Sequence, residues 1–164
     1  MVTPYHRRVQ KNIRNLGKKW ENRFEEVFND RRPVHIQHPM DKPNFLYFPD
    51  VAFRTRIGKM YLFEVIDSEK FSQAQIVAHV LETILTPQVL KVFFIVQDAR
   101  VRRTVANITE ILVATLSDRG MKSVKRVQFR YAIITLRDSQ SPDTVERILV
   151  ETGQFPHLQR GLRG

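Results

Sequence analysis

Two acidic side chains stand out because of the residues around them. Asp50 follows Pro49, and Glu64 lies inside the apolar run of residues 60–66. A carboxylate among apolar side chains costs several kcal/mol unless it is paired or bound to a cation. Two neighbouring carboxylates also repel each other unless a positive group lies between them. A hard divalent cation such as Mg²⁺ or Mn²⁺, which prefers oxygen ligands, is a group that this pair could bind.

The elements around these two residues predict that they meet. Residues 45–53 are aromatic and β-branched, broken by Pro49, which indicates a strand with an irregular start. The apolar run at 60–66 is typical of a strand buried on both faces. Residues 56–59, which include Gly58, form a turn between the two strands. Such a hairpin could place Asp50 and Glu64 side by side.

Hydrophobic spacing predicts the remaining elements. Apolar residues at every third or fourth position indicate a helix over residues 5–29, which Gly17 interrupts and could divide in two. Asp98 is expected to cap a later helix. The other expected elements are strands at 34–38, 91–96 and 127–136, and helices at 71–85, 98–120 and 142–150.

This order predicts an α/β fold with a mixed sheet flanked by helices, in the order α-β-β-β-α-β-α-β-α. The chain of 164 residues has room for one domain and hardly two. We expect a single domain over residues 1–152 and a flexible tail over residues 153–164.

Together with this order of elements, one motif resembles that of a known family. Pro49-Asp50, followed after thirteen residues by Glu64-Val65-Ile66, is similar to the motif of the PD-(D/E)XK nuclease superfamily, which includes restriction endonucleases and Holliday-junction resolvases. The resemblance implies a restriction-endonuclease-like core and a metal-dependent DNA endonuclease. It implies Asp50, Glu64 and the carbonyl of Val65 as ligands of Mg²⁺ or Mn²⁺.

Other residues are placed near the metal by the same resemblance. The segment from Gly17 to Glu21 looks like the family's first-helix pattern, which implies that Glu21 binds the metal through water or orients the nucleophile. Gln75 and His79 lie one helical turn apart, like a pair that some members hold beside the active site. Gln75 would donate to a phosphate oxygen.

The sequence departs from the family pattern at one position. The third motif residue is normally Lys, which polarises the attacking water, whereas this chain has Ile66. Lys70, four residues further on, could reach back over the site and replace it, and Lys59 is a weaker candidate. Alternatively, catalysis has been lost and DNA binding kept.

Positive charge is concentrated in two segments. The chain carries 27 Lys and Arg against 17 Asp and Glu, a net charge of +10. Residues 1–32 hold nine basic and four acidic side chains, and residues 99–130 hold eight and two. These segments would attract a nucleic-acid backbone. The basic residues expected to contact DNA are Lys18, Lys19, Arg100, Arg102, Arg103, Lys122, Lys125 and Arg126.

Several classes of protein are excluded or disfavoured. The chain has no Cys, which removes disulfides, Cys-bound metal centres and thiol nucleophiles. It contains no phosphate-binding or dinucleotide-binding glycine motif and no Gly-x-Ser-x-Gly elbow. Neither a membrane-spanning run nor a secretory leader is found, so we expect a cytoplasmic protein without a membrane partner.

Three functions are therefore kept open. The first is a Mg²⁺- or Mn²⁺-dependent DNA endonuclease that hydrolyses phosphodiesters, for which a homodimer is plausible because many relatives cut both strands as dimers. The second is a catalytically inactive DNA-binding protein of the same fold. The third is a basic α/β module that binds a protein partner, in which Asp50 and Glu64 are paired by chance.

Overall fold

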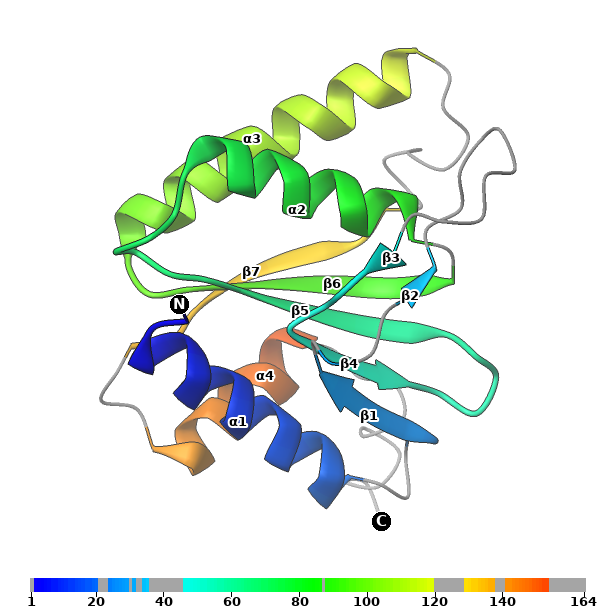
Figure 1. Ribbon diagram of the computed structural model, residues 1–164, viewed down its shortest axis with the longest axis vertical. Coiled ribbons are helices and arrows are strands. Elements are labelled where there is room, and N and C mark those ends of the chain that lie inside the picture. The colour runs from blue at the N-terminus through cyan, green and yellow to red at the C-terminus, as the bar shows by residue number, and fades with distance from the viewer. Residues whose placement is uncertain are drawn as a thin grey trace.

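The chain is built on a mixed sheet with helices on both faces (Figure 1). The computed structural model describes residues 2–20, 24–29, 31, 34–35, 46–86, 88–119, 129–137 and 141–153. The elements in chain order are α1 (Pro4–Lys19), β1 (Glu26–Asn29), β2 (Val34–His35), β3 (Leu46–Tyr47), β4 (Val51–Arg54), β5 (Met60–Ile66), α2 (Gln73–Leu85), β6 (Val89–Val96), α3 (Ala99–Asp118), β7 (Tyr131–Thr135) and α4 (Pro142–Gly153).

Within the described residues, the main sheet has five strands in the order β1-β4-β5-β6-β7. β4 pairs antiparallel with β1 and with β5, whereas β6 is parallel to β5 and β7 is parallel to β6. Parallel neighbours need a crossover connection, and α2 and α3 supply the two crossovers. The expected α/β class and the expected order of helices and main-sheet strands are confirmed.

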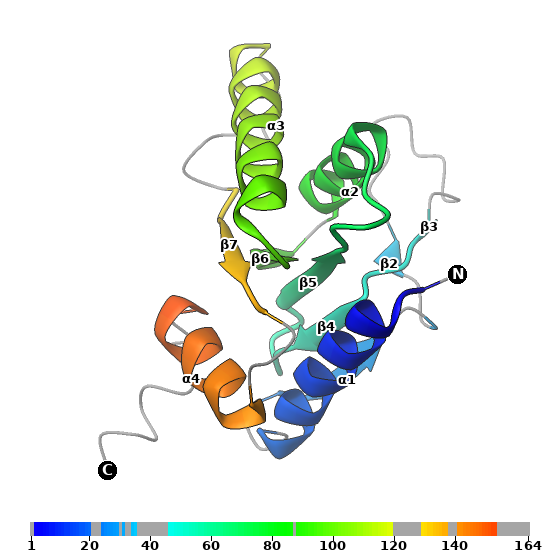
Figure 2. The ribbon, with the colours of Figure 1, turned by 90° about the vertical axis from the view of Figure 1, so that its left-hand side faces the viewer.

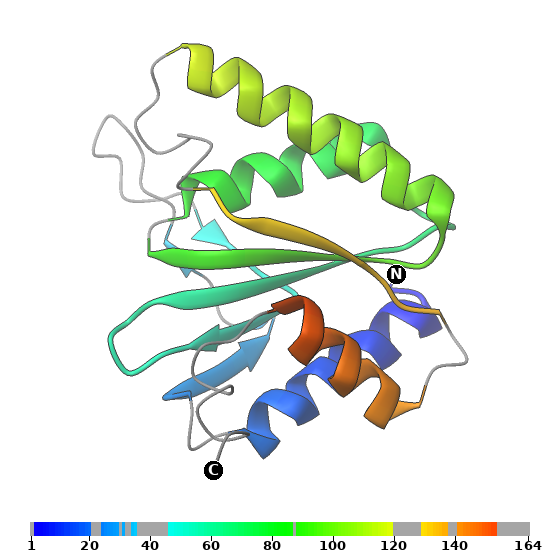
Figure 3. The same cartoon turned by 180° about the vertical axis from the view of Figure 1, so that it is seen from behind.

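Each face of the sheet has its own hydrophobic core. α1 and α4 cover one face, and α2 and α3 cover the other (Figure 2, Figure 3). Every residue of β5 is buried, because this strand lies in the middle of the sheet between the two helical layers. Its nearly continuous apolar sequence follows from that position. Glu64 is therefore placed in a fully buried strand.

The helix expected over residues 5–29 ends much earlier. α1 ends at Lys19, and residues 26–29 form β1, which pairs with β4 from Glu26 opposite Arg54 to Asn29 opposite Val51. The apolar spacing continues through Phe24 and Val27 and is compatible with a helix. Pairing with a strand more than twenty residues away decides the conformation instead, and local spacing does not report such pairing.

The next two strands also differ from the expectation. Among the described residues, β2 and β3 form a separate two-stranded sheet, so the strand expected at 34–38 does not belong to the main sheet. β1 is instead the first strand of the main sheet in chain order. The strand expected at 45–53 is divided into β3 and β4 by residues 48–50, which include Pro49. Proline lacks the N–H that an uninterrupted ladder needs.

Gly17 has a packing role and does not interrupt the helix. A Cβ atom at this position would lie 2.5 Å from Cε1 of Phe53 and 2.8 Å from Cγ2 of Val27. Real Cβ contacts are longer than this, so only glycine lets α1 approach β1 and β4 so closely.

Gly17→Ala is therefore expected to lower the free energy of unfolding by about 1–3 kcal/mol, because Phe53 or Val27 must move to admit the methyl group. Asn15→Ala, at an exposed position of the same helix, is the control. It should be neutral or slightly stabilising, since Ala has the higher helix propensity. Urea unfolding followed by circular dichroism measures both variants. Equal stabilities would contradict the packing role of Gly17.

Candidate active site

The β4–β5 hairpin brings Asp50 and Glu64 together. Its register pairs Val51 with Phe63, so the next position along both strands sets Asp50 opposite Glu64. The connecting turn contains Gly58 at a φ of 78°, which glycine adopts without strain. Asp50 lies just before β4 and not within a strand, and its backbone forms a hydrogen bond with the Glu64 carboxylate. The hairpin therefore makes Asp50 and Glu64 neighbours, and the Asp50 backbone contacts the Glu64 carboxylate. The side-by-side placement of the two carboxylates stays a prediction.

The start of α1 holds the Asp50 side chain. Nε2 of His6 lies 2.9 Å from Oδ1 of Asp50, and the backbone N–H of Val65 donates to Oδ2 at 2.8 Å. Gln10, one turn after His6, donates to the backbone carbonyl of Asp50 at 2.8 Å. Burial tends to lower the pKa of His6, but the hydrogen bond and charge of Asp50 outweigh it and raise this pKa above its usual 6.5.

A second contact fixes the start of α1 against the end of β5. The hydroxyl of Thr3 accepts the backbone N–H of His6 at 3.3 Å, which caps α1, and donates to the carboxylate of Asp67. Asp67 follows β5 directly and also accepts the backbone N–H of Glu69 at 2.9 Å. The N-terminal turn of α1 is thus anchored beside the two acidic residues.

The Glu64 carboxyl group is almost completely shielded from solvent. Its residue is 1% exposed, and the hydroxyl of Tyr47 donates to Oε1. Burial raises the pKa of Glu64 to about 7, although the positive charge of His79 and the hydrogen bond from the Asp50 backbone oppose this rise. A carboxyl group that changes charge near neutral pH is typical of functional sites.

His79 brings positive charge to the other side of Glu64. Its Nδ1 lies 3.5 Å from Oε2 of Glu64 and 3.6 Å from Oε2 of Glu82, and within the described residues it has no hydrogen-bond partner. Burial alone would lower the pKa of His79. The neighbouring carboxylates of Glu82, Glu64 and Asp50 raise it to about 9 instead, so this imidazole is protonated at neutral pH.

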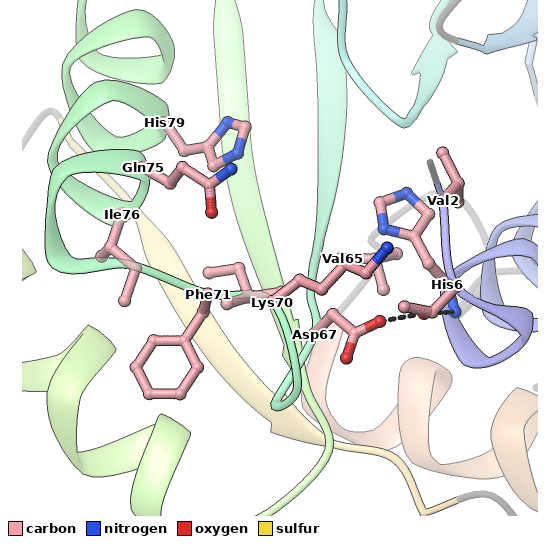
Figure 4. Close-up of a pocket in the computed structure, with 11 residues that line it drawn as sticks. Val2, His6, Val65, Asp67, Lys70, Phe71, Gln75, Ile76 and His79 are labelled. Atoms are coloured by element: carbon pink, nitrogen blue, oxygen red, sulfur yellow. Dashed lines mark hydrogen bonds between the residues drawn. The ribbon is translucent and has the colours of Figure 1, made fainter.

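A pocket of about 340 Å³ opens beside these groups (Figure 4). It is lined by residues from the start of α1, the end of β5 and the first turns of α2, which are Val2, Thr3, His6, Val65, Ile66, Asp67, Lys70, Phe71, Gln75, Ile76 and His79. Lys70 extends across the pocket with its ammonium towards the side of His6 and Val65, and Gln75 and His79 come from α2. Gln75 also completes the cap of α2, where it pairs with Ser72.

The described residues of α1 that contact Asp50 are His6 and Gln10. Glu21 lies outside the described residues. Lys18 and Lys19 are exposed at the end of α1, and Lys19 pairs with Glu146 at 2.9 Å. Lys19 is about 20 Å along the helix from His6. Neither His6 nor Gln10 is among the site residues predicted from the sequence, although their four-residue spacing places both on one helix face.

The expected DNA-contacting residues are placed in part. Lys122, Lys125 and Arg126 lie outside the described residues. Arg100, Arg102 and Arg103 are exposed at the start of α3, whose first turn holds no acidic residue. The helix dipole disfavours cations at this end of a helix. Arg100 lies over the ring of Phe71 at the pocket, and Arg102 donates to Oγ1 of Thr135 at 3.1 Å.

The acidic pair fits a hard cation by donor type. Carboxylate oxygens of Asp50 and Glu64 and the carbonyl of Val65 are the ligand atoms that Mg²⁺ prefers, and Mg²⁺ keeps several waters when it binds few carboxylates. Burial raises the pKa of Glu64 despite the charges of His79 and His6, and a cation bound beside the carboxyl group would lower it. In the part of the chain that the structure describes, however, no three His, Asp or Glu side chains are grouped so as to hold a metal ion. Binding would require His6 and Tyr47 to yield their contacts with the carboxylates.

Comparison with models of protein families, with curated proteins and with solved structures finds no significant match. The described helices include none that is both apolar enough and long enough to cross a bilayer. The resemblance to PD-(D/E)XK nucleases therefore stays a hypothesis, and the function has to be argued from the geometry of the site.

The buried Glu64 predicts a dependence of stability on pH. Its pKa is about 7 in the folded state against 4.5 for an ordinary Glu, so between these values the folded state binds more protons than the unfolded state. The free energy of unfolding should therefore fall as the pH rises through this range. Thermal unfolding at a series of pH values, with EDTA present, measures the effect.

Glu64→Gln should show a smaller fall over the same range, because the variant has no titrating group at this position. Glu151→Gln, at an exposed position of α4, should keep the wild-type slope. Parallel profiles for wild type and Glu64→Gln would contradict the assignment of the raised pKa to Glu64.

Proposed function

We propose that the protein is a Mg²⁺- or Mn²⁺-dependent DNA endonuclease of the PD-(D/E)XK type. The observation that carries the proposal is the register of β4 and β5, which sets Asp50 opposite Glu64 beside a pocket that Lys70 crosses. The order of elements, which begins with a helix and three antiparallel strands, supports the same assignment.

The acidic pair would hold the metal. Asp50, Glu64 and the carbonyl of Val65 would be its ligands from the protein. When bound, Mg²⁺ or Mn²⁺ supplies positive charge that makes a neighbouring water easier to deprotonate and offsets charge on the phosphate. The N–H of Val65 would hold the Asp50 carboxylate in place. Preorganised donors of this kind lower the cost of reorganising the site during the reaction.

Lys70 would take the role that Ile66 cannot perform. Ile66 is 4% exposed and packs in the core beneath α2 and α3, so it offers neither charge nor a proton. Lys70 reaches across the same pocket from the loop before α2. Its ammonium would orient the attacking water and neutralise charge on the phosphate, and Gln75 would donate to a phosphate oxygen.

The proposed reaction is hydrolysis of one phosphodiester bond. The oxygen of water bonds to phosphorus, the bond from phosphorus to the leaving sugar oxygen breaks, and that oxygen takes a proton. Lys18, Lys19, Arg100, Arg102 and Arg103 would hold the flanking backbone without reading its sequence.

A second candidate is a DNA-binding protein of the same fold that does not cleave. Ile66 at the Lys position favours it, and so do the protein donors that already occupy both carboxylate oxygens of Asp50. Under this alternative, DNA would be retained at about 0.1 M salt. It would not be cut with either metal.

Asp50→Asn and Glu64→Gln should each reduce cleavage of DNA by about a hundredfold or more, because charge stabilisation at the phosphate is lost. Asp118→Asn, at an exposed position near the end of α3, should keep wild-type activity. Gel electrophoresis of plasmid and linear DNA with Mg²⁺ or Mn²⁺ measures the rates. DNA that is bound by all variants and never cut would establish the second candidate instead.

Lys70→Met separates a relocated catalytic Lys from an inactive site. It should lower the cleavage rate strongly, since neither the introduced thioether side chain nor Ile66 can orient water. Lys59→Met is the matched control. Lys59 precedes the first residue of β5, whereas Glu64 lies near the last residue of this strand. A similar rate for Lys70→Met and wild type would show that Lys70 does not replace the motif Lys.

A further inference from the structure

A stacked pair of side chains flanks the pocket. The guanidinium carbon of Arg100 lies 5.3 Å from the centre of the Phe71 ring, a cation–π arrangement. Nη2 of Arg100 also donates to the backbone carbonyl of Ser68 at 3.3 Å. Phe71 lines the pocket and packs partly against the core beneath α2. The pair therefore joins the loop after β5 to the first turn of α3.

Lys70 and Phe71 leave the loop before α2 in different directions (Figure 4). Lys70 and Phe71 are neighbours in sequence, yet Lys70 extends across the pocket and the ring of Phe71 points the other way (Figure 4). Arg100 is exposed although its guanidinium is held by two contacts. A guanidinium group that is already held against a ring loses little further conformational entropy when a ligand stacks on it.

We infer that Phe71 and Arg100 form a stacking platform for an unpaired nucleotide next to the phosphate pocket, so that the preferred substrate is single-stranded nucleic acid or a single-stranded segment of a larger one. This inference rests on the proposed function for the phosphate site and names its substrate class. Bases of single strands stack on aromatic rings and guanidinium planes.

A base within a duplex is a poor partner for this platform. Both of its faces are covered by neighbouring bases, and moving it out of the stack costs free energy. Positive charge alone attracts duplex and single strand alike through their phosphates. If stacking contributes, the protein therefore binds single strands more tightly than duplexes. Substitutions that remove the stacking groups and keep the charge should reduce this preference.

Binding in EDTA tests the inference without cleavage. Fluorescence anisotropy compares a short labelled oligothymidylate with a blunt duplex at about 0.1 M salt. Arg100→Lys keeps the charge and loses the planar group, and it should weaken binding of the single strand about tenfold while duplex binding is unchanged. Phe71→Leu keeps an apolar side chain at the core and should have the same selective effect. Thermal unfolding verifies that both variants fold.

Arg56→Lys is the matched control, because Arg56 is an exposed arginine in the turn between β4 and β5 and is not among the expected DNA contacts. It should change neither affinity by more than about twofold, since charge is conserved. Equal effects of Arg100→Lys and Arg56→Lys, or equal losses for single strand and duplex, would overturn the inference.

The outcomes separate this inference from the proposed function. A selective loss in Arg100→Lys with no DNA cleavage under any metal condition would sustain the platform and reject the nuclease. Metal-dependent cleavage that Asp50→Asn abolishes, without any preference for single strands, would sustain the nuclease and reject the platform.

Discussion

The carboxyl group of Glu64 is the constraint around which the site is arranged. An apolar side chain in this fully buried strand would be the less costly choice for stability alone. Instead the hydroxyl of Tyr47, the backbone of Asp50 and the charge of His79 converge on the carboxyl group from three parts of the chain. Even with these partners burial keeps its pKa at about 7. A carboxyl group that is buried at this cost is typical of functional sites, and a bound cation is the partner that we propose for it.

The fold explains why positive groups from distant elements can reach this point. The antiparallel hairpin supplies both carboxylates, while the parallel step from β5 to β6 places the start of α2 at the same edge of the sheet. Lys70 and His79 come from that crossover, and His6 comes from α1 on the opposite face. α1 also has a packing constraint of its own, the close approach at Gly17. The topology therefore assembles the site, and substitutions that disturb the packing of these helices should change its geometry.

The sequence predicted the features that depend on local pattern. The apolar run at 60–66 predicts that β5 is buried, and Gly58 predicts the turn before it. Together they predict a hairpin in which Asp50 lies next to Glu64. The end of α1 and the strand β1 could not be obtained in this way, because β1 depends on pairing with β4 across the intervening chain. His6 and Asp50 are 44 positions apart in the sequence, and the residues next to them do not indicate that they are in contact. Long-range contacts of this kind appear only when the layers are assembled.

Binding of Mn²⁺ tests the central claim most directly, because it requires neither a substrate nor turnover. Electron paramagnetic resonance of Mn²⁺ titrated with the protein reports free metal, and the account predicts one site that Mg²⁺ displaces. The site should be lost in Asp50→Asn and in Glu64→Gln and kept in Asp118→Asn. Binding that both carboxylate variants retain, or an absence of binding in the wild type, would contradict the account.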